Sequence, residues 1–171
     1  MRLLAWLLPI VILSGCGWHL RGVIPFPAEY KVLYLNSQAS NSFNRQLTMQ
    51  LEFNDVLLTD NSGDAQAVLN IQELDIERRT LSLTSSGQIA EFELNGRLTA
   101  TLKRNDRDSH VQVEVKSRRR VNNDVNNVLG TATAEKQQLA ELEKSLANKL
   151  MLRLQRLNYD DESQPVAENK K

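Results

Sequence analysis

The stretch EFELNGRLTATLK, residues 91–103, alternates apolar and polar side chains over most of its length. One phase is apolar: Phe92, Leu94, Leu98, Ala100 and Leu102. The other phase is polar: Glu91, Glu93, Asn95, Arg97 and Lys103. Residues two apart in a strand point to the same face. The stretch therefore predicts a strand with one packed and one wet face, as antiparallel sheets allow.

The stretches on either side repeat this alternation. In residues 67–76 the apolar phase slips after Ile71, which predicts a β-bulge near residues 72–73. In residues 111–115 every second residue is valine. Turn-rich segments at 84–88 and 104–109 join the three stretches, and an earlier apolar run at 31–36 predicts one more buried strand. We expect a mostly antiparallel sheet of about four strands.

Two amphipathic helices complete the pattern. In residues 43–54, Phe43, Leu47 and Leu51 recur with helical spacing. A longer helix is expected over 134–157, with Thr131 or Thr133 as its N-cap and a leucine stripe formed by Leu139, Leu142, Leu146, Leu150 and Leu154. The order is strand, helix, three strands, helix. It predicts an α+β fold, a two-layer sandwich with both helices on one face of the sheet.

The N-terminus reads as a lipoprotein signal. A short positive head is followed by an apolar run too short to cross ~30 Å of hydrocarbon, which fits a secretory signal peptide over residues 1–15. Leu13, Ser14 and Gly15 lead to Cys16, the single cysteine of the chain, and resemble the bacterial lipobox. We expect lipidation at Cys16 with a diacylglycerol and an N-acyl (palmitate-type) chain. By the same resemblance Gly17, in place of an aspartate, directs the protein to the outer membrane.

These features give the expected organisation of the chain. Residues 16–28 form a lipidated tether, 29–158 a single α+β domain, and 159–171 a polar, disordered tail. The 171 residues carry 21 basic and 21 acidic side chains. A neutral balance of this kind argues against nucleic acid as a partner.

Sequence motifs for catalysis are missing. The two histidines, His19 and His110, have no partner pattern, and no metal-binding, CxxC or phosphate-loop motif occurs. We therefore expect no catalytic residues, no metal and no cofactor other than the lipid on Cys16.

The stretch GCGWHLRG, residues 15–22, resembles the start of the LptE family of lipopolysaccharide-assembly lipoproteins, and GQIAEFEL, residues 87–94, is a second similarity. The order of elements agrees over about residues 17–157. The resemblance implies a non-catalytic lipoprotein of the Gram-negative outer membrane, on its periplasmic side. It would plug the LptD β-barrel in a 1:1 complex from within the lumen, help that barrel assemble, bind lipopolysaccharide and assist its passage to the outer leaflet.

The basic residues that the family uses near its first meander turn and before its last helix are replaced here by Thr84, Ser85 and Ser86 and by residues 131–133. Those contacts are not carried over. Candidate substitutes for binding lipopolysaccharide phosphates are Arg78, Arg79, Lys116, Arg118, Arg119 and Arg120. Alternation places Lys116, Arg118 and Arg120 on the solvent face with His110. A solvated strand edge, protected from aggregation by its charge, explains the same residues.

A second function stays open, a periplasm-facing lipid carrier that acts without a barrel partner. The aliphatic filling of the expected sandwich favours a solid core over a cavity for acyl chains. A lipid-modifying hydrolase would need a nucleophile–base pair, and the sequence lacks one.

Overall fold

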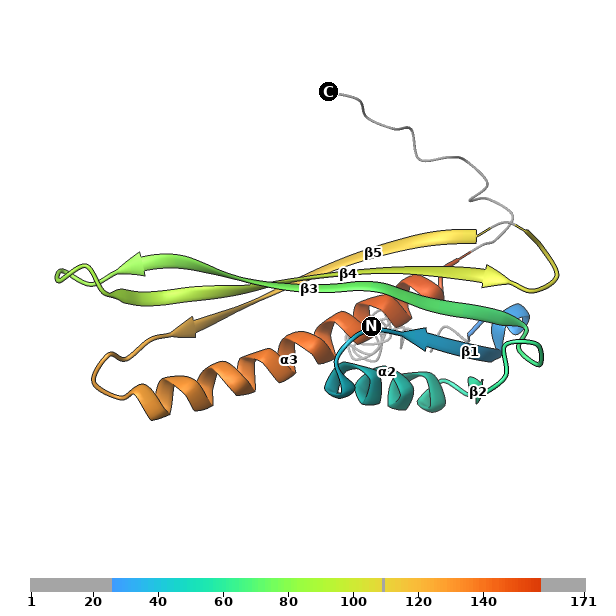
Figure 1. Ribbon diagram of the computed structural model, residues 1–171, viewed down its shortest axis with the longest axis horizontal. Helices are drawn as coiled ribbons and strands as arrows, with labels where there is room; N and C mark the ends of the chain where they lie inside the picture. The colour runs from blue at the N-terminus through green and yellow to red at the C-terminus, as the bar shows by residue number, and fades with distance from the viewer. Residues whose placement is uncertain (1–25, 109, 158–171) are drawn as a thin grey trace, which may run out of the picture.

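The computed structural model describes residues 26–108 and 110–157. In chain order the elements are η1 (Ala28–Tyr30), β1 (Val32–Ser37), α2 (Asn41–Phe53), β2 (Leu57–Thr59), β3 (Ala67–Leu83), β4 (Ile89–Arg104), β5 (His110–Asn122) and α3 (Val128–Leu154). The strands form one sheet in the order β2-β1-β3-β4-β5. Both helices lie on one face of this sheet (Figure 1). The predicted α+β sandwich is confirmed, with five strands in the described chain rather than about four.

The sheet combines two kinds of pairing. Because α2 crosses over between β1 and β2, these two strands run parallel, and β1 also runs parallel to β3. From β3 onward the strands form an antiparallel meander. The short strand β2 was not predicted from the sequence, because its three residues are too few to show an alternation of apolar and polar side chains.

The strand β1 accompanies β3 over only the first part of its length. β1 ends opposite Ile71, whereas β3 continues to Leu83 and spans about 55 Å. We call the part in which α2 and α3 lie together beneath the sheet the base. The remainder, residues 77–95 and 118–142, is the distal arm, in which α3 alone accompanies the strands (Figure 1).

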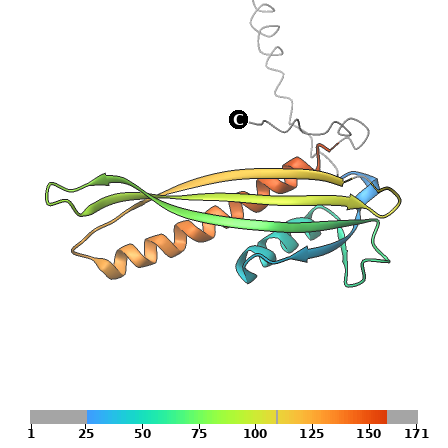
Figure 2. The same cartoon turned by 45° about the horizontal axis from the view of Figure 1, so that its top comes forward.

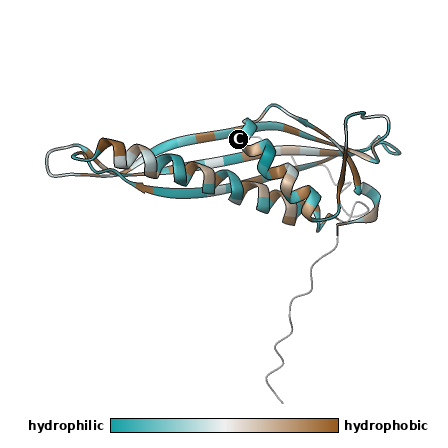
Figure 3. Ribbon diagram, turned by 90° about the horizontal axis from the view of Figure 1, so that it is seen from below, coloured by the Kyte–Doolittle hydropathy of each residue, from teal (hydrophilic) through white to brown (hydrophobic). Residues whose placement is uncertain are grey.

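The core follows the predicted stripes. All five apolar residues of the β4 phase are buried, as are Phe43, Leu47 and Leu51 of α2. Four of the five predicted leucines of α3 are fully buried, and Leu139 is partly buried. Seen from the helix side, hydrophobic and hydrophilic residues alternate along both helices, as amphipathic helices require (Figure 3).

The predicted bulge is present and has a packing consequence. Ile71 pairs with Ala100 and Glu73 with Thr99, so Gln72 is the extra residue. The insertion returns Leu74 and Ile76 to the helix side of the sheet. Without it, the apolar residues after residue 72 would point to the opposite face.

Two boundaries differ from the prediction. α3 begins at Val128, before the expected start at 134, and its N-cap is Asn127, whose side chain accepts a hydrogen bond of 2.9 Å from the Gly130 N–H. The prediction of Thr131 or Thr133 as the cap was wrong, because the first turns of α3 are largely exposed and leave no apolar stripe to read. The core also includes Phe26, only 3% exposed, in the segment that the sequence analysis assigned to the tether.

Candidate functional site

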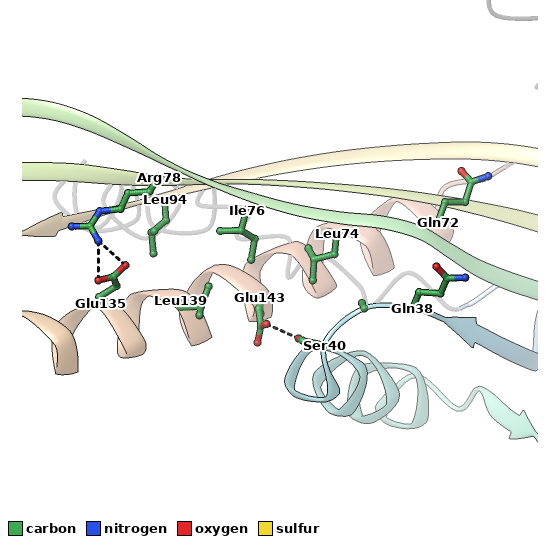
Figure 4. A pocket seen from close by; sticks show the side chains of 11 residues that line it. Gln38, Ser40, Gln72, Leu74, Ile76, Arg78, Leu94, Glu135, Leu139 and Glu143 are labelled. Carbon is green, nitrogen blue, oxygen red and sulfur yellow. Dashed lines mark hydrogen bonds and ion pairs between the residues drawn. The ribbon is translucent and has the colours of Figure 1, made fainter.

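A cleft of about 500 Å³ opens where the base meets the distal arm. It lies between β3 after the bulge, α3 and the connection from β1 to α2 (Figure 4). Its apolar lining comes from Ala39, Leu74, Ile76, Leu94 and Leu139. Its polar lining comes from Gln38, Ser40, Gln72, Arg78, Glu135 and Glu143. The cleft therefore has the mixed lining that suits an amphipathic ligand.

Arg78 stands at the distal end of the cleft. Its Nη1 lies 3.3 Å from Glu135 Oε1 on α3, and its Cζ lies 3.5 Å from the centroid of the Phe92 ring. The Arg78 side chain is nevertheless 46% exposed. A guanidinium stacked on a ring keeps its donors aligned for a planar anionic partner. A phosphate at this position would compete with Glu135 for Arg78.

A hydrogen bond between the N-cap of α2 and α3 borders the cleft (Figure 4). Ser40 accepts a hydrogen bond from the Phe43 N–H as the N-cap of α2, and its hydroxyl donates to Glu143 Oε1 at 2.7 Å. Glu143 is 5% exposed, so this donor satisfies a buried carboxylate. The bond fixes the start of α2 against α3 and sets the width of the cleft there.

The other face of the sheet carries a second, different surface. In the described part of the chain no helix covers it (Figure 2). The strand register aligns charges across it in rows: Arg79, Glu93 and Arg120; Glu77, Asn95 and Arg118; Asp75, Arg97 and Lys116. A shallow groove of about 380 Å³ runs through these rows. Acidic and basic side chains are mixed, so this face is polar without being strongly basic.

The six candidate cations do not form one patch. Arg79, Lys116, Arg118 and Arg120 lie on the open face, as alternation predicts for the last three. Arg78 and Arg119 lie on the helix side, and both pair in register with Leu94. Arg119 is therefore separated from Arg118 and Arg120, because successive strand residues point to opposite faces.

Several of these cations have partners. Arg79 pairs with Glu93 at 3.3 Å, and the Arg119 side chain donates to the Arg118 carbonyl. Lys116 contacts Glu114 at 2.6 Å, and this hydrogen bond lowers the pKa of Glu114 below its ordinary value. Arg118 and Arg120 form no ion pair within residues 26–108 and 110–157. A role in lipopolysaccharide binding stays a prediction for all six.

The cleft was not predicted from the sequence, whose aliphatic residues indicated a solid core. The one signal of the cleft in the sequence was the phase slip at residue 72. The bulge there turns Leu74 and Ile76 toward α3, at a place where α2 does not fill the space beneath the sheet. In the part of the chain that the structure describes, no group of three His, Cys, Asp or Glu side chains is placed to hold a metal ion. Within the same residues no helix is long and apolar enough to cross a membrane. Cys16 lies outside the described residues.

Comparison with known proteins agrees with this architecture. The chain is 36% identical over 97 residues to the LPS-assembly lipoprotein LptE of Photorhabdus laumondii, which covers 54% of this chain and 53% of that protein. It is 31% identical over 90 residues to the LPS-assembly lipoprotein LptE of Pectobacterium atrosepticum, which covers 51% and 48%. The matches thus span about half the length of these relatives.

Solved structures share the fold. Rare lipoprotein B of Shewanella oneidensis matches with a TM-score of 0.63 at 22% identity, over 72% of this chain and 92% of that one. Lipoprotein B of Nitrosomonas europaea matches with a TM-score of 0.64 at 22% identity, over 79% and 88%. The model of the LptE family, described as lipopolysaccharide-assembly, matches residues 28–154. The chain belongs to the LptE family.

Proposed function

We propose that this protein is a non-catalytic lipoprotein of the outer membrane of a Gram-negative bacterium. In this proposal it plugs the LptD β-barrel, helps that barrel assemble and assists the recognition and insertion of lipopolysaccharide. The observation that carries the proposal is the family match over residues 28–154. Two features of the geometry support it.

The first supporting feature is the open face of the sheet. The lumen of an outer-membrane barrel is polar and wet. A surface with rows of mixed charge, such as Asp75, Arg97 and Lys116, suits such a lumen and is too polar to bind an apolar surface. The elongated shape, with strands of about 55 Å, suits insertion along a barrel axis.

The second feature is the cleft on the helix side. Its apolar lining next to Arg78 matches a ligand that joins acyl chains to phosphates, which is the chemistry of lipopolysaccharide. The same cleft also suits the alternative, a lipid carrier without a barrel. The two functions differ in what surrounds the protein in the cell.

A photocrosslinking experiment in intact cells separates these functions. A crosslinkable residue is placed at Arg97 on the open sheet face and, in a second strain, at Gln137 on the exposed side of α3. A plug is enclosed on all sides, so both positions should form a crosslink to the barrel. Crosslinks from one position only indicate docking on the outside of a partner, and crosslinks from neither favour the carrier.

The lipid anchor has its own test. Cys16→Ser removes the thiol that would receive the diacylglycerol, because a hydroxyl is a much weaker nucleophile. We expect the wild-type protein from membranes to carry the mass of added acyl chains and the variant to lack it, as measured by intact mass. A wild-type N-terminus without added acyl mass would refute lipidation.

A further inference from the structure

A basic trough lies at the end of the base, outside the cleft. Of the six candidate cations for lipopolysaccharide binding, only Lys116 lines it. Two adjoining hollows of about 300 and 230 Å³ run between β5 and the last turns of α3. Their cationic lining is Lys116, Lys149, Arg153 and Arg156. Glu114 is the one acidic residue that lines either hollow in the described chain, which leaves a local excess of positive charge.

Two of these cations lie on α3 and one follows it. Lys149 and Arg153 are four residues apart, which places them on one helical face, and Arg156 lies in the turn just after α3 ends at Leu154. All three residues are exposed. No sequence pattern marked these residues, because they are spaced through a leucine-rich segment rather than clustered along the chain.

Their interactions leave most of this charge available. Lys149 Nζ donates to the Lys116 carbonyl at 2.6 Å, which holds α3 against the edge strand. Arg153 and Arg156 form no ion pair within the described residues. Cations in the last turn of a helix do stabilise its macrodipole, but Lys149 lies earlier in α3 and Lys116 lies on a strand, so that effect does not explain the trough as a whole.

The trough lies at the end of the molecule where the described chain begins. The Tyr30 hydroxyl donates to the Leu157 carbonyl at 2.8 Å, and the Phe26 and Tyr30 rings are in edge contact at 5.5 Å. Phe26 and the C-terminal end of α3 therefore share one end of the base. The chain from Cys16 to Phe26 reaches at most ~35 Å when fully extended. With Cys16 in the membrane, this end is held near the bilayer surface, while the tip of the distal arm is about 55 Å further along β3.

We propose that Lys116, Lys149, Arg153 and Arg156 form a docking surface for the anionic headgroups of the membrane that carries the anchor. The orientation rests on the proposed lipidation of Cys16, whereas the headgroup chemistry rests on the trough alone. Guanidinium groups bind phosphate oxygens in a planar, two-pronged manner. Exposed Leu152, at 49%, adds an apolar side chain that suits the interface of a bilayer.

Docking of this kind would orient the protein before it meets a partner. A lipid anchor alone restrains position and leaves the domain free to tumble about its tether. Basic residues near an anionic surface each add an attraction that acts over a short range. The whole protein is formally neutral. Attraction to an anionic membrane should therefore depend on this trough rather than on overall charge.

The test is co-sedimentation of the unlipidated chain from Gly17 to Lys171 with vesicles. It contains all the core residues of the described chain. Vesicles contain phosphatidylglycerol and phosphatidylcholine, or phosphatidylcholine alone. We expect binding to the anionic vesicles only, weakening as salt is raised. Binding to neither vesicle at low salt would overturn the proposal.

Two variants locate the binding. The trough variant Lys149→Gln/Arg153→Gln/Arg156→Gln should bind at least tenfold more weakly. The matched control, Arg45→Gln/Lys136→Gln/Lys144→Gln, removes the same charge from exposed positions of α2 and α3 outside the trough and should bind as the wild type does. Equal losses in both variants would mean that net charge, not the trough, drives binding, and would overturn the proposal.

A charge-preserving variant tests whether a loss of binding comes from the lost charge or from a misfolded protein. Arg153→Lys/Arg156→Lys should keep most of the binding, and thermal melts check that each variant is folded. The vesicles contain neither lipopolysaccharide nor a barrel. A negative result therefore refutes membrane docking and leaves the proposed role in lipopolysaccharide assembly unaffected.

Discussion

The base and the distal arm share three strands and one helix, but the far end of the arm leaves more of its apolar side chains exposed along these shared elements. In the base, Leu146, Leu150 and Leu154 of α3 are fully buried between the sheet and α2. In the arm, Leu129 of the same helix is 81% exposed and Leu83 of β3 is 59% exposed. A helix with one neighbouring layer cannot bury its whole apolar side. Burial along α3 therefore depends on how many elements pack against it, and the cleft lies where α2 begins beside it.

The largest expected effect tests this comparison directly. Leu146→Ala and Leu150→Ala each remove a fully buried side chain, which costs about 2–5 kcal/mol of unfolding free energy. The matched control in the arm, Leu129→Ala, should change it by less than about 0.5 kcal/mol. Chemical denaturation of the unlipidated protein measures all three. Equal losses in the base and the arm would remove the distinction between them.

A close approach in the base gives the next effect. Gly96 lies on the helix side of β4, and a Cβ built there would be 2.8 Å from Leu146 Cδ1. Gly96→Val should cost about 1–3 kcal/mol through overpacking. The cost should shrink in a Leu146→Ala background, because the clashing atom is then gone. The same cost in both backgrounds would show that the glycine is needed for another reason.

The two faces of the arm should differ in ligand binding. Arg78 and Arg119 border the helix side, whereas Arg118 and Arg120 lie on the open face. If the cleft holds the lipid phosphates, Arg78→Ser/Arg119→Ser should weaken lipopolysaccharide binding at least tenfold, or about 1.4 kcal/mol. Arg118→Ser/Arg120→Ser then acts as the matched control. Binding assays at low salt decide, and both pairs should leave barrel co-purification intact. Loss through the control pair alone would move the site to the open face.

The smallest effect concerns the ion pair at the cleft. Arg78 and Glu135 are 46% and 33% exposed, so their coupling should be about 0.2–1 kcal/mol and should fall with added salt. A double-mutant cycle with Arg78→Gln and Glu135→Gln measures it through unfolding. A coupling well above 1 kcal/mol would mean that this pair is a strong tie between β3 and α3 that an anion would not readily displace.

Periodic patterns in the sequence were enough to predict the layers of this protein. Alternation in residues 91–103 and 111–115 and the leucine stripe of α3 predicted which side chains are buried, because strands and helices repeat their directions with fixed periods. The slip after Ile71 even located the bulge, since each misplaced apolar residue would otherwise face water. Turn residues marked the end of an element only where an apolar pattern also ended. The first turns of α3 and the short β2 have no such pattern, so they were not predicted.

The candidate sites depended on the tertiary structure. Alternation predicted that Arg118 and Arg120 share the solvent face, but it could not place Arg119 opposite Arg78 across Leu94. The cleft and the basic trough join residues from different elements, such as Glu143 with Ser40 and Lys116 with Lys149. Their proximity follows from strand register and from where α2 begins, and neither is encoded in a local period. Local patterns decide which face a side chain takes, and only packing between elements decides what it meets there.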